Sequence, residues 1–285
     1  RAHRLRGSPV MTDVLAFGEI LWDVIDGVPH LGGAPFNLAA HAAKCGLGAS
    51  IVSAVGRDDL GRRALEEARR LGVATDFIEE HPTLPTGTVN VTLGAHGIPS
   101  YEIVKPVAWD EIGFPTSADV NPRAFCFGTL AQRSAVSAAT LSRLIASLPD
   151  SMLVFFDVNL RQDYWSRDLV VCGLKRTDIL KVNDDEMRAL GFAPDSLFAR
   201  FPRLSAVIET RGPEGCVVFT RGGAPFASPA LPDGPVIDTV GAGDSFSAAF
   251  LAAILRGEAI EEAAVAGNRL AGKVASRAGA IPEGL

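Results

Sequence analysis

Short apolar runs alternate with helix-forming segments along most of this chain, and this alternation limits the possible folds more than any other feature. Residues 14–20 and 50–55 are compact apolar runs typical of buried strands. Residues 35–45 and 62–71 have the composition of helices that end at glycine. Because strands that alternate with helices usually pair in parallel and are covered on both faces, the sequence predicts an α/β fold with a mostly parallel sheet.

The alternation continues through the second half of the chain. We predict further strands at residues 123–127, 152–158, 179–182, 206–210 and 216–220, and further helices at residues 135–148, 167–175, 184–190, 242–256 and 261–277. The Gly/Pro-rich residues 221–235 indicate turns between short strands, and no repeat or low-complexity linker divides the chain. We therefore expect a single domain over residues 11–285.

Two short segments at residues 86–93 and 100–105 interrupt the alternation. Apolar and polar residues alternate from Val89 to Leu93, as in a strand with one exposed face. These segments predict a small antiparallel excursion from the main sheet. It is either a flap over a binding site or a decorative hairpin, and the local sequence favours neither.

The composition excludes several classes of protein. The formal net charge is -6 without a basic stripe, so we expect no nucleic-acid partner. The five histidines lack metal-ligand spacing, and the four cysteines form no Cys-x-x-Cys pair, as in a reduced cytoplasmic protein. Apolar runs such as residues 248–255 are too short to cross a membrane. Residues 1–10 lack the apolar segment of a secretory signal, and we expect them to be an added leader before a native start at Met11.

The sequence DTVGAGDSF at residues 238–246 joins a turn of small residues to a long apolar segment with helical character. Backbone N–H groups and the helix dipole make such a helix start an anion site, here at Gly241, Ala242 and Gly243. Asp244 follows at once, and a carboxylate beside a bound anion is suited to take a proton from a hydroxyl that attacks phosphorus. The alternative for Asp244 is a plain helix cap, since aspartate is a favoured capping residue.

Residues 32–39, GGAPFNLA, form a second glycine turn before a helix. Gly32 and Gly33 let a ligand approach the backbone without a Cβ clash, and the Asn37 amide can both donate and accept hydrogen bonds. Asp23, just after the first strand, carries a carboxylate that can accept hydrogen bonds from two adjacent hydroxyls. A tight turn and a solvated loop aspartate are the alternatives.

Two further segments follow predicted strands, where ligands of open α/β sheets bind. Residues 157–161, DVNLR, contain Arg161, which suits phosphate oxygens or, alternatively, a surface salt bridge. Asn183 and Glu186 share a helix face, and their oxygens suit a hydrated Mg²⁺; a plain acidic helix start is the alternative. The chain has no Walker lysine motif and no Gly-x-Gly-x-x-Gly after the first strand, which argues against P-loop and dinucleotide-binding proteins.

Together these motifs resemble those of the ribokinase-like sugar kinases, also called the PfkB family. Residues 238–244 match the family's C-terminal motif, and residues 32–39 are similar to its N-terminal glycine motif. DVNLR resembles the Asp-Pro-Asn-Leu-Arg of many fructokinases, with Val158 in place of proline, and GEIL at residues 18–21 is also similar to fructokinases. The resemblance extends from residue 18 to residue 279 and implies a three-layer α/β sandwich. It also implies a small β lid at about residues 86–105, with some of residues 23–31.

The resemblance implies a role for each candidate residue. The implied catalytic base is Asp244, with the anion hole at Gly241, Ala242 and Gly243. The implied sugar-binding residues are Asp23, Gly32, Gly33, Asn37 and Arg161. The implied ATP-binding residues are Asn183, Thr210, Gly212, Gly215, Asn268 and Gly279, although residues 210–215 also fit a plain strand-turn-strand connection. The implied metal sites are Glu186 and Asn183 for Mg²⁺ through water, and Asp238 for a monovalent cation such as K⁺.

The implied activity is transfer of the γ-phosphoryl group of ATP to a sugar hydroxyl. The fructokinase-like segments favour D-fructose as the acceptor and fructose 6-phosphate as the product. Ribose, 2-keto-3-deoxygluconate and nucleosides are alternative acceptors, and a non-catalytic sugar or nucleotide sensor is an alternative function. Residues 127–133 follow a strand and are a further candidate for substrate contacts. The resemblance also suggests a homodimer that forms through the lid.

Overall fold

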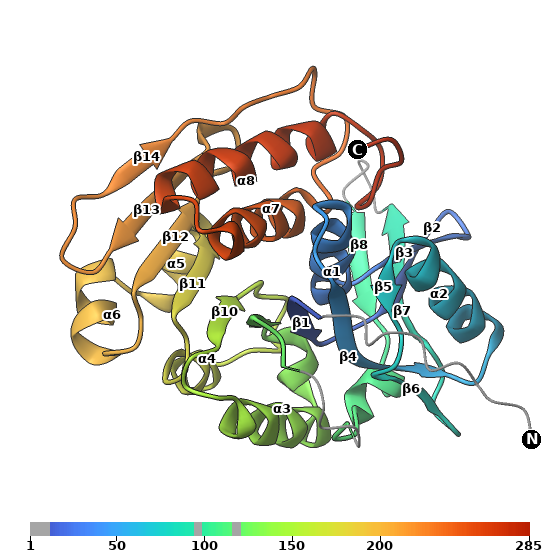
Figure 1. The fold of residues 1–285 in the computed structure, drawn as a ribbon. Coiled ribbons are helices and arrows are strands. Elements are labelled where there is room, and N and C mark those ends of the chain that lie inside the picture. Colours follow the sequence, from blue (N-terminus) through green and yellow to red (C-terminus); the bar gives the residue numbers. More distant parts are fainter. Residues whose placement is uncertain (1–11, 94–98, 116–120) are drawn as a thin grey trace, which may run out of the picture.

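The computed structural model describes residues 12–93, 99–115 and 121–285. Its main sheet has ten strands in the order β14-β13-β12-β11-β10-β9-β1-β4-β5, and β6 pairs with β4 (Figure 1). The pairs from β5 and β6 through β12 are parallel, whereas β13 pairs antiparallel with both β12 and β14, so β13 is the one strand of this order that runs in the opposite direction. This arrangement confirms the predicted α/β fold. The strands are β1 (Val14–Phe17), β4 (Ala49–Gly56), β5 (Val73–Ala74), β6 (Ile78–His81), β9 (Ala124–Phe127), β10 (Leu153–Asp157), β11 (Ile179–Asn183), β12 (Ala206–Thr210), β13 (Cys216–Thr220) and β14 (Phe226–Ser228).

Helices cover both faces of this sheet, which gives the three layers. Along β1, Val14 and Ala16 belong to one hydrophobic core, and Leu15 and Phe17 belong to the other. One core is completed by α1 (Ala34–Lys44), α2 (Asp59–Arg70), α7 (Ala242–Arg256) and α8 (Ile260–Ala275). The other is completed by α3 (Ala135–Ser147), α4 (Arg167–Leu174), α5 (Asp184–Leu190) and α6 (Pro194–Arg200). The central strands β1 and β9 are apolar throughout because both of their faces are buried.

A second sheet of four strands, which we call the small sheet, lies beside the main one (Figure 1). Its order is β3-β2-β7-β8, with β2 and β7 parallel and the outer pairs antiparallel. Its strands are β2 (Leu21–Ile25), β3 (Val28–Gly32), β7 (Gly87–Leu93) and β8 (Pro99–Ile103). Because β2 and β3 lie between β1 and α1 in the chain, the small sheet borders the carboxyl end of β1.

Some boundaries differ from the predicted ones. The predicted strand at residues 14–20 is wrong in its second half, since β1 ends at Phe17 and β2 begins at Leu21. The chain turns at Gly18, where φ is 146° and a Cβ atom would lie 2.6 Å from Pro35 Cγ. Helix α2 begins earlier than predicted because Asp58 caps it, accepting from the Gly61 amide at 2.7 Å. The short elements β5, β6, β14 and α6 were not predicted.

No helix in the described parts of the chain combines the length and the apolarity needed to cross a membrane.

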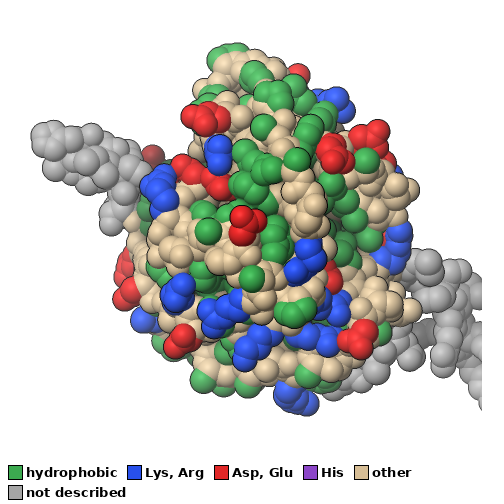
Figure 2. All heavy atoms as spheres, turned by 90° about the vertical axis from the view of Figure 1, so that its left-hand side faces the viewer, with side chains coloured by type: hydrophobic (Ala, Val, Ile, Leu, Met, Phe, Trp, Pro, Cys, Tyr) green, Lys and Arg blue, Asp and Glu red, His purple; other side chains and the backbone are tan. Residues whose placement is uncertain are grey.

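Figure 2 shows the face that lies on the left in Figure 1, where β13, β14 and α6 are found. Lys and Arg side chains gather in the lower half of this face, with acidic side chains among them. Two ion pairs involve α5 and the chain after α6: Arg188 lies 2.8 Å from Asp184, and Arg203 lies 3.0 Å from Asp178. The charge of these two arginines is therefore partly neutralised by their neighbours.

Candidate active site

The first turn of α7 begins at Gly241, which caps the helix in a left-handed conformation with φ of 76°. A Cβ atom at Gly241 would strike the carbonyl oxygen of Ala280, so a larger residue does not fit without a backbone shift. The amides at the start of an α-helix have no partner within the helix, and they point toward its N-terminal side. In this turn the Ala242 amide donates to the carbonyl oxygen of Thr239 at 3.2 Å, so the amides of Gly241 and Gly243 are the candidates for contact with an anion.

Asp244 lies in this first turn and contacts a residue 207 positions away in the chain. Its Oδ2 accepts a hydrogen bond from Asn37 Nδ2 at 2.8 Å, and Asn37 belongs to α1. Burial and the repulsion from Asp157 raise the pKa of Asp244 to about 6, although Asn37, Lys181 and Arg161 oppose this shift. A carboxylate with such a pKa is ionised at neutral pH and is more basic than an exposed aspartate.

Asn37 keeps one unused hydrogen-bonding atom at this place. The residue is 4% exposed, and no described group donates to its buried Oδ1. An unpartnered buried acceptor is costly unless a ligand or water completes it. Asn37 thus links α1 to the Asp244 carboxylate on α7 and leaves one acceptor atom for a ligand or a water molecule.

Asp23 and the glycine pair lie on the small sheet and at the start of α1. Asp23 pairs with His30 in the β2–β3 register, and its Oδ2 lies 2.9 Å from the place of a Cβ atom at Gly32. A side chain at Gly32 would therefore crowd this carboxylate. Burial raises the pKa of Asp23, while His30 and Arg161 lower it. A Cβ atom at Gly33 would strike the carbonyl oxygen of Glu19, so the backbones approach closely here.

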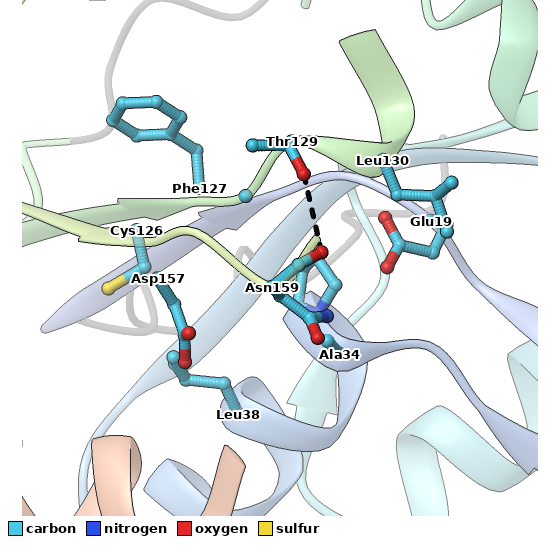
Figure 3. A pocket seen from close by; sticks show the side chains of 11 residues that line it. Glu19, Ala34, Leu38, Cys126, Phe127, Thr129, Leu130, Asp157 and Asn159 are labelled. Carbon is cyan, nitrogen blue, oxygen red and sulfur yellow. Dashed lines mark hydrogen bonds between the residues drawn. The ribbon is translucent and has the colours of Figure 1, made fainter. Parts of the chain in front are cut away.

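A small cavity lies where β1, β9 and β10 end, next to the start of α1 (Figure 3). Its volume is about 20 Å³, enough for about one water molecule, so this cavity alone is too small for a larger ligand. Thr129 and Asn159 meet across it, since Thr129 Oγ1 lies 3.3 Å from the carbonyl oxygen of Asn159. The predicted segment 127–133 contributes to this lining. The lining residues from that segment are Phe127, Gly128, Thr129 and Leu130.

Glu19 also lines this cavity, and the sequence analysis did not identify it as a site residue. The residue is 3% exposed, and burial raises the pKa of its carboxyl group to about 7, against the effects of nearby amides and Arg161. The available signal was a lone carboxylate directly after a buried apolar strand. Such a residue is rarely buried without a function or a partner.

Arg161 follows β10 and is exposed. Its charge lowers the pKa of three carboxyl groups, those of Glu19, Asp23 and Asp244. Arg161 therefore lies close enough to these three carboxyl groups to balance part of their negative charge. Its Nη1 donates to the carbonyl oxygen of Leu160 at 3.0 Å.

A buried ion pair lies beneath the first turn of α7, and the sequence analysis did not identify it either. Lys181 Nζ lies 2.9 and 2.8 Å from the two carboxylate oxygens of Asp157. The Ser247 hydroxyl donates to the same carboxylate at 2.9 Å. A lysine in an apolar strand was the available signal, because lysine is almost never fully buried without a partner.

Asn183 and Glu186 form a capping box at the start of α5. The Asn183 side chain accepts from the Glu186 amide at 2.7 Å, and Glu186 Oε2 accepts from the Asn183 amide at 2.8 Å. Glu186 Oε1 accepts from the Leu160 amide at 2.7 Å. The described residues include no cluster of three or more His, Cys, Asp or Glu side chains that would hold a metal alone. The Asn183 side-chain oxygen and both Glu186 carboxylate oxygens already accept from backbone amides, so a Mg²⁺ ion here would be held through water or phosphate oxygens.

The predicted nucleotide residues lie on other elements. Thr210 ends β12, and a 3-10 turn, η4 (Gly212–Glu214), leads to Gly215 and β13. Asn268 on α8 donates to the carbonyl oxygen and the hydroxyl of Ser228 at 3.0 and 2.9 Å, so its amide group fastens α8 to β14.

Asp238 has both carboxylate oxygens engaged by backbone amides. It accepts from the amides of Val240 and Gly279 at 2.9 and 3.0 Å. These bonds hold the chain before α7 against the residues that follow α8. Each oxygen retains a lone pair for a cation, but the protein contacts alone already account for this aspartate.

Comparisons with known proteins show the family and the fold to which this chain is similar. The model of the pfkB family carbohydrate kinases matches residues 11–284. A sugar kinase from Pyrococcus horikoshii is 30% identical over 266 residues, which cover 85% of this chain and 83% of that one. Its crystal structure in complex with ATP gives a TM-score of 0.83 at 26% identity and covers 94% of each chain.

Two fructokinases are also similar to this chain. Fructokinase-2 of Oryza sativa is 27% identical over 310 residues, covering 94% of this chain and 90% of that protein. The fold also matches the fructokinase of Vibrio cholerae with fructose, ADP and calcium bound, at 23% identity and a TM-score of 0.82 over 95% of each chain. The family match covers nearly the whole chain, and the chain therefore belongs to the pfkB family of carbohydrate kinases.

Proposed function

We propose that this protein transfers the γ-phosphoryl group of ATP to a hydroxyl of D-fructose and releases fructose 6-phosphate and ADP. The observation that carries the proposal is the hydrogen bond between Asn37 and Asp244. It joins the helix that follows the glycine pair to the helix that carries the anion-binding turn. A sugar hydroxyl at this junction lies beside a base and in front of an anion site.

The residues suit direct transfer. Asp244 accepts the proton of the attacking hydroxyl as the new O–P bond forms and the bond between the γ-phosphorus and its bridging oxygen breaks. The start of α7 at residues 241–243 stabilises the negative charge on the transferred group, chiefly through the amides of Gly241 and Gly243, since that of Ala242 donates to Thr239. Asp23, Asn37 and the close approach at Gly32 and Gly33 orient the sugar, and Arg161 is available for phosphate oxygens.

We assign the nucleotide to the side of Thr210, Gly212, Gly215, Asn268 and Gly279, in line with the family membership. Asn183 and Glu186 would hold Mg²⁺ through water, and the ion would offset phosphate charge when bound. A monovalent cation near Asp238 is part of the same proposal. Because ATP and sugar phosphates are cytoplasmic metabolites, we also assign the protein to the cytoplasm.

The choice of fructose rests on the residues 18–21 and 157–161 and on the named fructokinases among the relatives. Charge gives a second argument. In this proposal Glu19, Asp23 and Asp244 lie around the bound sugar. The charge of Arg161 lowers the pKa of all three carboxyl groups. This balance favours a neutral sugar over a sugar acid such as 2-keto-3-deoxygluconate.

A coupled ADP-release assay over a panel of acceptors tests the proposal. The panel contains D-fructose, D-ribose, 2-keto-3-deoxygluconate and a nucleoside, and ³¹P NMR identifies the phosphorylated position. We expect the highest kcat/KM for D-fructose, with the phosphate on O6. A higher kcat/KM for another acceptor would reassign the substrate, and tight sugar binding without ADP release from any acceptor would favour a sensor.

A further inference from the structure

Lys181, on β11, is 7% exposed, and its contacts extend from the sheet to the first turn of α7. Its ammonium group lies within 2.9 Å of both oxygens of Asp157, at the end of β10. Ser247, in the second turn of α7, donates to that carboxylate at 2.9 Å and lies 3.1 Å from the carbonyl oxygen of Gly243. The ion pair is thus fastened to the helix that starts at the anion-binding turn.

The ammonium group also lies directly beneath that turn. A Cβ atom built at Gly243 would be 3.3 Å from Lys181 Nζ. Glycine at this position therefore leaves the turn close to the buried cation. Asp244 is the next residue, and the charges of both Asp157 and Lys181 act on it.

The charged groups that face Asp244 come from four elements. Asp157 and Lys181 lie on the two neighbouring strands below it, Arg161 on the loop after β10, and Glu19 on the turn after β1. Arg161 is exposed, whereas Lys181 is buried, so the field of Lys181 is much less screened by solvent. Without Lys181, Asp157 would be a second buried negative charge near the base.

We propose that Lys181 is a positioning residue for the phosphoryl transfer: its ammonium group offsets the charge of Asp157 beneath α7 and so holds the turn of residues 241–243 and the Asp244 carboxylate in their working state. The inference rests on the proposed function for its meaning in catalysis. The alternative is a purely structural ion pair, since buried pairs are weak evidence for a contribution to stability.

Three variants and a control separate the two roles. Lys181→Met leaves Asp157 unbalanced, Asp157→Asn leaves Lys181 unbalanced, and the double variant removes both charges. Ser247→Ala is the control, because it removes a hydrogen bond to Asp157 and no charge. Aspartate carboxyl groups are labelled with ¹³C, the Asp244 signal is identified by its loss in Asp244→Asn, and its titration is followed by NMR in each folded protein.

The proposal predicts opposite shifts in the two single variants. The pKa of Asp244 rises by about 1 pH unit in Lys181→Met, falls by about 1 unit in Asp157→Asn, and returns to the wild-type value in the double variant. Ser247→Ala titrates like the wild type. If Lys181→Met does not fold, Asp157→Asn and the double variant still decide the question. An unchanged Asp244 titration in all folded variants would overturn the proposal.

Activity adds an independent readout. The acidic limb of kcat/KM moves in the same direction as the NMR titration in each variant, measured with whichever sugar the wild type phosphorylates. A structural role would lower activity at every pH without moving this limb. If the wild type phosphorylates no sugar in the panel, the proposed function fails, but the NMR titration still tests the role of Lys181.

Discussion

Asp244 owes its chemical character to side chains that are distant in the sequence. Asn37 contacts it from α1, Asp157 repels it from β10, and Lys181 attracts it from β11. These neighbours, together with burial, place its pKa at about 6, between that of an ordinary aspartate and neutral pH. At the scale of the residue, the ionisation of Asp244 therefore changes near pH 6.

We expect kcat/KM for the sugar to fall below pH 6, approaching tenfold per pH unit. The reason is that Asp244 must be ionised to accept a proton, and its pKa in the free enzyme is about 6. The measurement is initial-rate kinetics from pH 5 to 8, with circular dichroism to show that the fold is intact. Glu19→Gln is the control, because Glu19 also titrates near pH 7 and its removal should leave the limb of Asp244 in place. A rate that stays constant down to pH 5 would contradict the role of Asp244.

The buried Glu19 makes the stability of the folded protein depend on pH. Its pKa is about 7 in the folded protein and 4.5 in the reference state, so the folded state binds the proton more tightly. Stability from this group is therefore greatest below pH 4.5 and is lost as the pH rises through 7. The full difference corresponds to at most about 3 kcal/mol. We expect Glu19→Gln to be more stable than the wild type at pH 8 and little changed at pH 5.

Urea unfolding of both proteins at pH 5 and pH 8 measures this difference. Comparison of the two proteins is needed because His41 acts in the opposite direction. Burial lowers the pKa of His41 to about 4, so its contribution is lost as the pH falls from 6.5 to 4. An equal effect of Glu19→Gln on the free energy of unfolding at both pH values would contradict the raised pKa of Glu19.

At the scale of the element, the start of α7 depends on one glycine. Gly241 has a left-handed conformation, and a Cβ atom there would collide with Ala280. Gly257 at the other end of the same helix is also left-handed, but a Cβ atom there meets nothing within 4 Å. The two glycines therefore share a left-handed conformation and differ in the space for a side chain, so substitution of each by alanine gives a matched comparison.

We expect Gly241→Ala to abolish sugar phosphorylation and to destabilise the protein by more than Gly257→Ala. The second substitution carries only the conformational cost of alanine at positive φ, roughly 1 kcal/mol. The first adds a collision that displaces the anion-binding turn. Thermal unfolding and ADP release measure both effects. If Gly241→Ala keeps wild-type activity, the turn does not have the role that we assign to it.

At the scale of the whole molecule, the small sheet presents exposed apolar side chains. Ile25, Val28 and Tyr101 are 44%, 54% and 54% exposed on its strands. We propose that two copies pair through this sheet as a lid. Sedimentation should then give a dimer, and Val28→Lys should give a monomer of 30.0 kDa. Val136→Lys on α3 is the control, since Val136 is 49% exposed away from this sheet. A wild-type monomer at all concentrations would exclude this pairing.

The sequence predicted the main sheet well because its strands are continuous apolar runs between capped helices. It predicted β7 and β8, but it did not predict β2 and β3 as separate strands within residues 21–32. The reason is that β2 pairs with β7 across about 65 positions, a register that local patterns do not encode. The meeting of Asn37 and Asp244 was implied by their motifs. Glu19 and Lys181 were missed because a lone charge in an apolar run shows its neighbours only after folding.

The central claim is that Asp244 is the base for a sugar held at the junction of α1 and α7. The most direct test is Asp244→Asn, which keeps the size of the side chain and removes its basicity. We predict that kcat for sugar phosphorylation falls roughly 10³-fold, while the sugar Kd from calorimetry changes by less than about threefold. A variant that retains most of the wild-type kcat would contradict the claim.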